Sequence, residues 1–156
     1  MKTLILGLGN ELFGDDGVGI HVVRELKKRG NFKPNIDLIE TSVSGLALID
    51  IIAGYDRLII VDTIKKENPK VGNIKLLDLN QIRHIPGPSP HYVSFPQIIM
   101  LGKKLGLYMP EVVKIVAVEA KNIYKLGEGL SPEIKSAIPK IINKIKELIE
   151  EWGKNE

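Results

Sequence analysis

Three short apolar runs restrict the fold of this chain more than any other feature. They lie at residues 2–8, 57–62 (RLIIVD) and 112–118 (VVKIVAV). Runs of this length without polar alternation are typical of strands covered on both faces, as in a parallel sheet. Segments with helical spacing of apolar residues lie between them. This alternation predicts an α/β fold of three layers, α/β/α, around a mostly parallel, five-stranded twisted sheet.

The other elements follow from periodicity and from glycine and proline. Helices are expected over 15–28, 44–53 and 94–105, and strands over 36–40 and, at an edge of the sheet, over 72–77. Leu46, Ile49 and Ile52 are expected to face inward from the second helix. The four prolines of residues 84–96 argue against a helix or an inner strand there.

The last helix is expected to start at Ser131, as N-cap, with Pro132 at the first helical position. Its apolar stripe extends from Ile134 to Trp152, and Pro139 is expected to kink or split it. No repeat or linker is visible, so the 156 residues predict a single domain, 1–156.

Composition excludes several classes of function. The sequence has no cysteine, which rules out disulfides, thiolate metal sites and cysteine nucleophiles. The formal net charge is +3, but the lysines are spread along polar faces without interleaved aromatics, so no nucleic-acid partner is expected. No apolar run is long enough to cross a bilayer and no signal peptide is recognisable. We therefore expect a cytoplasmic protein without membrane insertion.

The glycine-rich turn of residues 7–19 (GLGNELFGDDGVG) has two competing interpretations. It supplies the first two glycines of a dinucleotide-binding fingerprint, and Glu40 would stand where a ribose-binding acid belongs. The third glycine position holds Leu12, however. Asp15 and Asp16 occupy the helix start where a pyrophosphate would bind, and their charge would repel it.

The carboxylates themselves favour a different site. In the simplest interpretation Asp15 caps the helix and Asp16 complements its dipole. Asp62 ends a central strand and should lie at the same sheet edge as the glycine turn. His91 stands in a proline-stiffened loop of the kind that often carries functional groups. Two carboxylates and an imidazole meeting there would suit a divalent metal with open coordination positions.

The remaining histidines and serines give weaker signals. His21 is expected to be packed or exposed within the first helix, and His84 to lie at the surface. Ser44 and Ser94 are interpreted as helix N-caps. A serine hydrolase is disfavoured because Ser42 occupies the first glycine position that a G-x-S-x-G elbow requires.

Four segments together resemble the hydrogenase maturation endopeptidases, which process the large subunit of nickel–iron hydrogenases. The match follows the family's order along nearly the whole chain. The matching segments are GLGNELFGDDGVG (7–19), RLIIVDT (57–63), SPHYVSF (89–95) and LGEGLSPEI (126–134).

The resemblance implies the residues of a site. The family's metal-binding side chains correspond to Asp16, Asp62 and His91, which are also its catalytic candidates. Many members carry glutamate at the first position, so Asp16 is a shorter variant. Gly45 matches the glycine of a loop beside the substrate, and Asp15 keeps a supporting role. The family sheet is mixed, and residues 72–77 are the candidate for its antiparallel strand.

The resemblance also implies a reaction. It is the hydrolysis of one peptide bond near the C-terminus of the hydrogenase large-subunit precursor, after nickel insertion. The nickel is carried by the substrate, and Cd²⁺ or Zn²⁺ can replace it in crystals. Since no cysteine or serine nucleophile is visible, water must attack, activated by a carboxylate or by metal. The alternatives are a nucleotide-binding or regulatory α/β module without protease activity, and a structural partner of a hydrogenase complex.

Overall fold

The computed structural model describes residues 1–84, 90–121, 123, 126–127 and 129–155, with the backbone alone at 82–84 and 90–94. Five strands form one sheet in the order β2-β1-β3-β5-β4. Neighbouring strands are parallel except β4, which is antiparallel to β5. The mixed sheet and the edge strand predicted near residues 72–77 are thereby confirmed. The strands are β1 (Thr3–Leu8), β2 (Ile36–Thr41), β3 (Arg57–Lys65), β4 (Ile74–Asp78) and β5 (Val112–Ala120).

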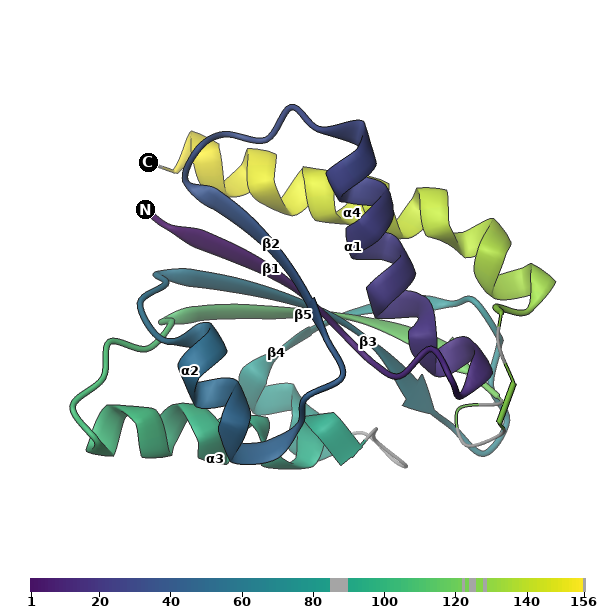
Figure 1. The fold of residues 1–156 in the computed structure, drawn as a ribbon, viewed down its shortest axis with the longest axis horizontal. Coiled ribbons are helices and arrows are strands. Elements are labelled where there is room, and N and C mark those ends of the chain that lie inside the picture. The colour runs from purple at the N-terminus through teal and green to yellow at the C-terminus, as the bar shows by residue number, and fades with distance from the viewer. Residues whose placement is uncertain (85–89, 122, 124–125, 128, 156) are drawn as a thin grey trace.

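Helices cover both faces of this sheet, which gives the three predicted layers (Figure 1). α1 and α4 lie on one face, and α2 and α3 lie on the other. The helices are α1 (Val18–Arg29), α2 (Leu48–Ile52), α3 (Pro90–Lys104) and α4 (Pro132–Lys154), with 3₁₀ turns η1 (Gly14–Gly17), η2 (Gly45–Ala47) and η3 (Leu79–His84).

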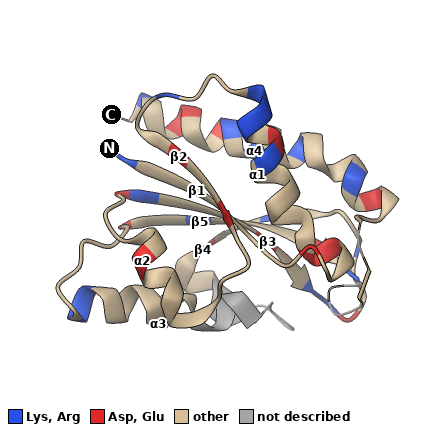
Figure 2. Ribbon diagram, viewed as in Figure 1, with Lys and Arg blue, Asp and Glu red and all other residues tan. Residues whose placement is uncertain are grey.

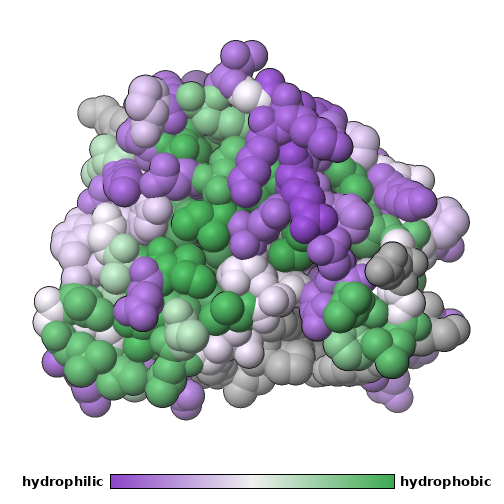
Figure 3. Space-filling model, in the orientation of Figure 1, coloured by the Kyte–Doolittle hydropathy of each residue, from purple (hydrophilic) through white to green (hydrophobic). Residues whose placement is uncertain are grey.

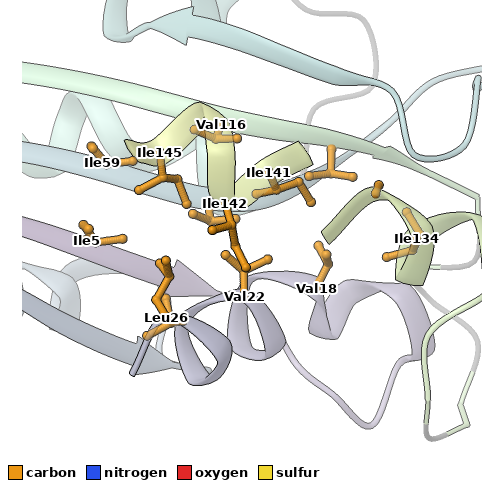
Figure 4. Packing of buried hydrophobic residues seen from close by; sticks show 14 of the residues in the cluster. Ile5, Val18, Val22, Leu26, Ile59, Val116, Ile134, Ile141, Ile142 and Ile145 are labelled. Carbon is orange, nitrogen blue, oxygen red and sulfur yellow. The ribbon is translucent and has the colours of Figure 1, made fainter. Parts of the chain in front are cut away.

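The face under α1 and α4 holds the first of two buried clusters. In Figure 4, Val22 and Leu26 of α1 lie close to Ile142 and Ile145 of α4, over Ile5 of β1. The predicted apolar stripe of α4 is buried, except that Ile138 is only partly buried and Ala137 takes part instead. The helix is continuous through Pro139, so the expected split is wrong.

The opposite face packs α2 and α3 against the second cluster, and β3 contributes to both. Leu58, Ile60 and Ile64 belong to the cluster under α2 and α3, whereas Ile59 and Val61 belong to the cluster under α1 and α4. This alternation is that of a strand covered on both faces. It fixes the face of the two residues that follow Val61: even-numbered side chains of β3 turn to α2 and α3, and odd-numbered ones to α1 and α4.

Two predicted helices differ in detail. The helix expected over 15–28 opens as η1 and becomes α-helical at Val18, and the helix expected over 44–53 is divided into η2 and α2. Ile49 and Ile52 are buried as predicted, but Leu46 is 65% exposed. The inward prediction for Leu46 is wrong because it lies in η2, before the α-helical spacing that aligns Leu48 and Ile52 begins.

The prediction that residues 84–96 avoid helix is wrong for their second half. α3 begins at Pro90, so Ser94 lies inside it and is not an N-cap, and Pro96 lies beyond the first turn. Pro90 loses no hydrogen bond there, because first-turn amides have no partner within the helix. The helix continues past Pro96 because Phe95 and the apolar residues after it pack into the core, and tertiary packing outweighs local preference.

The charged residues of the helices are mixed in sign. Lysines and glutamates are interspersed along α4, and Glu25 lies among the arginines and lysines of α1 (Figure 2). The outer face of α1 is the most hydrophilic region of the face in Figure 3. Such mixed faces are typical of solvated helices. Within the described part of the chain, no helix has the length and apolar character needed to cross a membrane.

Candidate functional site

The candidate site lies where the order of the strands reverses. From β1 the chain passes through α1 to β2 on one side, then returns through α2 to β3 on the other side of β1. The carboxyl ends of β1 and β3 therefore flank a switch point, which is where open α/β sheets bind ligands. Residues 9–17 follow β1 at this switch point, and Asp62 lies in the neighbouring strand β3.

Glycines in the turn bring η1 and α1 against these strands. A Cβ on Gly9, whose φ is +150°, would lie 1.9 Å from the carbonyl oxygen of Asp16. A Cβ on Gly19 would lie 2.4 Å from the carbonyl oxygen of Val61. Contacts this short exclude any side chain. The glycines that resemble a phosphate loop therefore serve close backbone packing, and this packing presents Asp16 to the end of β3.

Asp16 is held by donors from two elements. Its Oδ2 accepts a hydrogen bond from the amide of Asn10 at 2.9 Å, and its Oδ1 accepts one from the Thr63 hydroxyl at 3.0 Å. The residue is partly exposed. The bond to Thr63 joins the turn after β1 to β3 across the switch point. Asp16 is thus fixed beside the residue that directly follows Asp62.

Asp62 is completely buried at the end of the apolar part of β3. Its Oδ1 accepts a hydrogen bond from the amide of Thr63 at 2.7 Å. The alternation along β3 places Asp62 on the α2 and α3 face and Thr63 on the α1 face. β1 pairs with β3 only as far as Val61, opposite Gly7. The two residues lie just beyond this pairing, with their side chains on opposite faces of the strand.

His91, the third predicted ligand, lies in the first turn of α3, four residues before the buried Phe95. α3 covers the face of the sheet that carries Asp62. The His91 side chain lies outside the described residues. Among the side chains that are described, no group of three metal-ligating residues is present. The structure thus brings Asp16 and Asp62 to neighbouring positions and places the backbone of His91 on the helix over the Asp62 face.

Asp15 has a role that the sequence did not indicate. It is buried, with 3% of its surface exposed, and its oxygens accept hydrogen bonds from the Ser131 amide at 2.7 Å and the Ser131 hydroxyl at 3.0 Å. Asp15 therefore does not cap its own helix: it stands at the N-terminus of α4, where a negative charge is favourable. Ser131 occupies the N-cap position as predicted, but its hydroxyl bonds Asp15 and not the α4 backbone.

The segment before α4 is also joined to the turn after β1. The Gly14 amide donates to the Gly127 carbonyl oxygen at 2.8 Å, and the Gly127 amide donates to the Leu12 carbonyl oxygen at 2.9 Å. Together with the Asp15–Ser131 bonds, these contacts attach Gly127 and Ser131 to one side of the turn. Two residues of the motif LGEGLSPEI, Gly127 and Ser131, thereby support the loop that carries Asp16.

A charged cluster borders the other side of the turn. Arg24 of α1 donates two hydrogen bonds to Glu11, at 2.9 and 3.1 Å, and one to Glu40 of β2 at 3.1 Å. The hydrogen bonds from Arg24 lower the pKa of Glu11, and those to Glu11 and Glu40 raise the pKa of Arg24. A cavity of about 570 Å³ adjoins this cluster and the loop from Gly9 to Leu12. Glu40, considered above as a ribose ligand, is bonded to Arg24 instead.

The other predicted residues are placed as follows. Gly45 opens η2 with a φ of +69°, and open space surrounds the position of its absent Cβ. Ser44 is the N-cap residue of η2 but makes no side-chain cap hydrogen bond. His21 is half-buried in α1. His84 ends η3, and its side chain lies outside the described residues.

Comparison with known proteins identifies the family. The sequence profile of the family HycI, hydrogenase maturation protease, matches residues 20–148. The chain belongs to the hydrogenase maturation protease family. Its members are peptidases, so this protein is a hydrolase that acts on peptide bonds.

Relatives of this protease span almost all of the chain. HoxM, a hydrogenase expression/formation protein of Cupriavidus necator, is 26% identical over 97% of this chain and 75% of its own length. A Methanocaldococcus jannaschii protein assigned to the hydrogenase maturation proteases is 33% identical over 89% of this chain and 90% of its own length. The solved structure of the hydrogenase maturating endopeptidase HybD from Escherichia coli, 23% identical, superimposes with a TM-score of 0.85 over 98% of this chain and 94% of that chain. The last comparison confirms the expected fold.

Sequence reasoning missed Thr63 and Ser131 as partners of the aspartate pair. Thr63 offered one signal, because it directly follows a strand-terminal aspartate at a ligand-binding edge. Ser131 offered only the pattern of an N-cap. Its bond to Asp15 joins residues 116 positions apart and depends on how α4 docks.

Proposed function

We propose that this hydrogenase maturation protease removes a C-terminal peptide from the precursor of a nickel–iron hydrogenase large subunit after nickel insertion. Asp16, Asp62 and His91 recognise the nickel that the precursor carries. One observation supports this most directly: in a chain of this family, Thr63 holds Asp16 at the switch point beside the buried Asp62. Carboxylate and imidazole donors with open positions suit a divalent cation.

The donor chemistry fits such a cation. Each oxygen of Asp16 accepts one hydrogen bond, which leaves a lone pair on each for a further partner. A bound divalent ion would polarise a nearby carbonyl or lower the pKa of water. The residues of the chain would orient the scissile segment, and the carboxylates can take up or return a proton as general base and acid. Water is the nucleophile in this proposal, since the sequence has no cysteine and no serine elbow.

Single substitutions at the three residues test the assignment. Asp16→Asn, Asp62→Asn and His91→Ala should each abolish processing of nickel-loaded precursor, measured by the change in precursor size on gels and by mass spectrometry. Asp50→Asn, at an exposed aspartate of α2, serves as the matched control and should process normally. Far-UV circular dichroism and thermal melting establish that each variant is folded. Full activity of folded Asp16→Asn or Asp62→Asn would exclude the assignment.

Metal binding by the isolated protease provides an independent test. Crystals soaked in Cd²⁺ should show anomalous scattering between Asp16, Asp62 and His91. Density elsewhere, with none at this position, would count against the site. A nucleotide-binding module without activity has less support, because the chain belongs to a peptidase family and the two aspartates occupy the place of a pyrophosphate. Thermal stabilisation by NAD or flavin, with none by nickel salts, would favour that alternative.

A further inference from the structure

Thr63 contacts both aspartates of the proposed site through two different donors. Its hydroxyl donates to Oδ1 of Asp16 at 3.0 Å, and its amide donates to Oδ1 of Asp62 at 2.7 Å. We propose that Thr63 is a positioning residue that sets the two carboxylates for a shared cation. The proposal rests on the proposed function, because it assumes that these carboxylates are the ones that bind metal.

The strand geometry explains why this position can hold both groups. Asp62 and Thr63 lie on opposite faces of β3, and η1, which carries Asp16, lies on the Thr63 side. A side chain on the Asp62 face of β3 would not reach η1. The side chain of the next residue, Thr63, reaches η1, while the Thr63 backbone amide stays beside Asp62. Position 63 therefore couples the turn after β1 to the end of β3.

Burial and residue type make this coupling rigid. Thr63 is completely buried, so water cannot readily replace its hydroxyl as the donor to Asp16. Threonine is β-branched, which restricts its χ1 rotamers. The Asn10 amide holds the other oxygen of Asp16, so the carboxylate is fixed at both ends. The free lone pairs of Asp16 are thus oriented before any cation binds.

Loss of the hydroxyl should weaken metal binding without removing a ligand. Groups that orient a metal ligand typically contribute 10–100-fold to metal affinity. We expect Thr63→Val, which keeps the shape of the side chain, to weaken Ni²⁺ and Cd²⁺ binding by about 10–100-fold in isothermal titration calorimetry. Thr63→Ser retains the hydroxyl and should restore most of the affinity. Thr63→Ala repeats the loss of the donor if the valine variant does not fold.

Thr3→Val is the matched control. Thr3 is also a buried threonine of a central strand, but it lies at the start of β1, at the opposite end of the sheet. Its replacement should leave the affinity for both metals unchanged. A loss of affinity in Thr3→Val equal to that in Thr63→Val would reduce the effect to general loosening of the sheet and overturn the proposal.

A double-mutant cycle tests whether Thr63 acts through Asp16. Asp16→Asn should weaken metal binding, and adding Thr63→Val to it should cause little further loss, because the side chain that Thr63 orients has then already lost its charge and one metal-binding oxygen. Additive losses would overturn the positioning role. If Asp16→Asn alone leaves the affinity unchanged, the proposed metal site fails and this inference with it. If Asp16→Asn weakens binding but Thr63→Val does not, only the role of Thr63 fails.

Discussion

Replacing Ser131 by alanine removes one of the two hydrogen bonds that join the start of α4 to Asp15. The hydroxyl bond to Oδ2 is lost, while the bond from the Ser131 amide to Oδ1 can remain. Asp15 stays buried with one oxygen deprived of its protein partner. The change therefore tests one contact between the turn after β1 and the last helix.

The magnitude follows from the charge and the burial of Asp15. A hydrogen bond to a charged group contributes about 1.5–3 kcal/mol. Ser131 is only half-buried, so water can restore part of the loss. We expect Ser131→Ala to lower the free energy of unfolding by about 1–2 kcal/mol. Asp15→Asn should cost more, about 3 kcal/mol, because an amide cannot accept hydrogen bonds at both of its terminal atoms.

Urea unfolding measures the change, with Ser136→Ala as the control. Ser136 lies on the exposed side of the same helix, and its hydroxyl bonds only the Pro132 carbonyl oxygen one turn earlier in the described structure. Alanine is the better helix former there by a few tenths of a kcal/mol, so this variant should be neutral or slightly stabilised. With a typical slope of about 2 kcal/mol per molar urea, Ser131→Ala should lower the midpoint by roughly 0.5–1 M. A midpoint equal to that of Ser136→Ala would refute the reasoning.

Two further predictions concern the turn and a buried tyrosine. Gly9→Ala should destabilise the protein by more than about 3 kcal/mol, since its Cβ would overlap the Asp16 carbonyl at a positive φ. Gly153→Ala should not, because its Cβ would meet only the Lys33 side-chain nitrogen, at an ordinary contact distance of 3.9 Å. Equal urea midpoints for the two variants would contradict this. Burial and the hydrogen bond to Asp37 raise the pKa of Tyr55 to about 12. The contribution of neutral Tyr55 to the free energy of unfolding is fully present below pH 10. It is lost as pH rises toward 12, because the tyrosine of the unfolded state ionises first. Absorbance titration should show a late transition that Tyr55→Phe reduces; Tyr108, whose pKa is also raised by its hydrogen bond to Asp56, accounts for the rest. A late transition unchanged in Tyr55→Phe would exclude the shift.

The central strands β1, β3 and β5 were predictable from the sequence because each contains a short apolar run bounded by turn residues. The start of α3 was not, since proline at the first helical position and proline in a loop look alike without the partner surface. Leu46 was assigned to the wrong side for a related reason: a 3₁₀ turn shifts the phase of the apolar spacing before α2 begins. Local patterns therefore identified the elements, whereas their phases and ends depended on packing.

The strand pattern by itself predicted only the approximate location of the site, at one edge of the sheet. Asp16 follows β1 and Asp62 lies near the carboxyl end of β3, and these strand ends share one edge of the sheet, so topology alone brings the two residues close. The sequence could not show that Thr63 bonds Asp16, because that contact depends on how closely Gly9 and Gly19 let η1 approach β3. The two adjacent aspartates look alike in their local pattern, and only the family resemblance assigned the proposed site role to Asp16. The bonds that Asp15 makes to Ser131 depend on the docking of α4, which no local pattern shows.

The backbone of the turn after β1 uses most of its own donors. The amides of Asn10, Leu12, Phe13, Gly14 and Asp16 all donate hydrogen bonds, four within the turn and one to Gly127. A loop bonded in this way is ordered before any partner arrives, so a peptide that binds beside it meets a fixed surface. For the precursor proposed as substrate, the conformational entropy lost on association would then fall on the C-terminal tail that is cleaved and not on the protease. Selectivity would in that case depend on how readily each tail can be immobilised, and a tail still packed against its own protein would be a poor substrate.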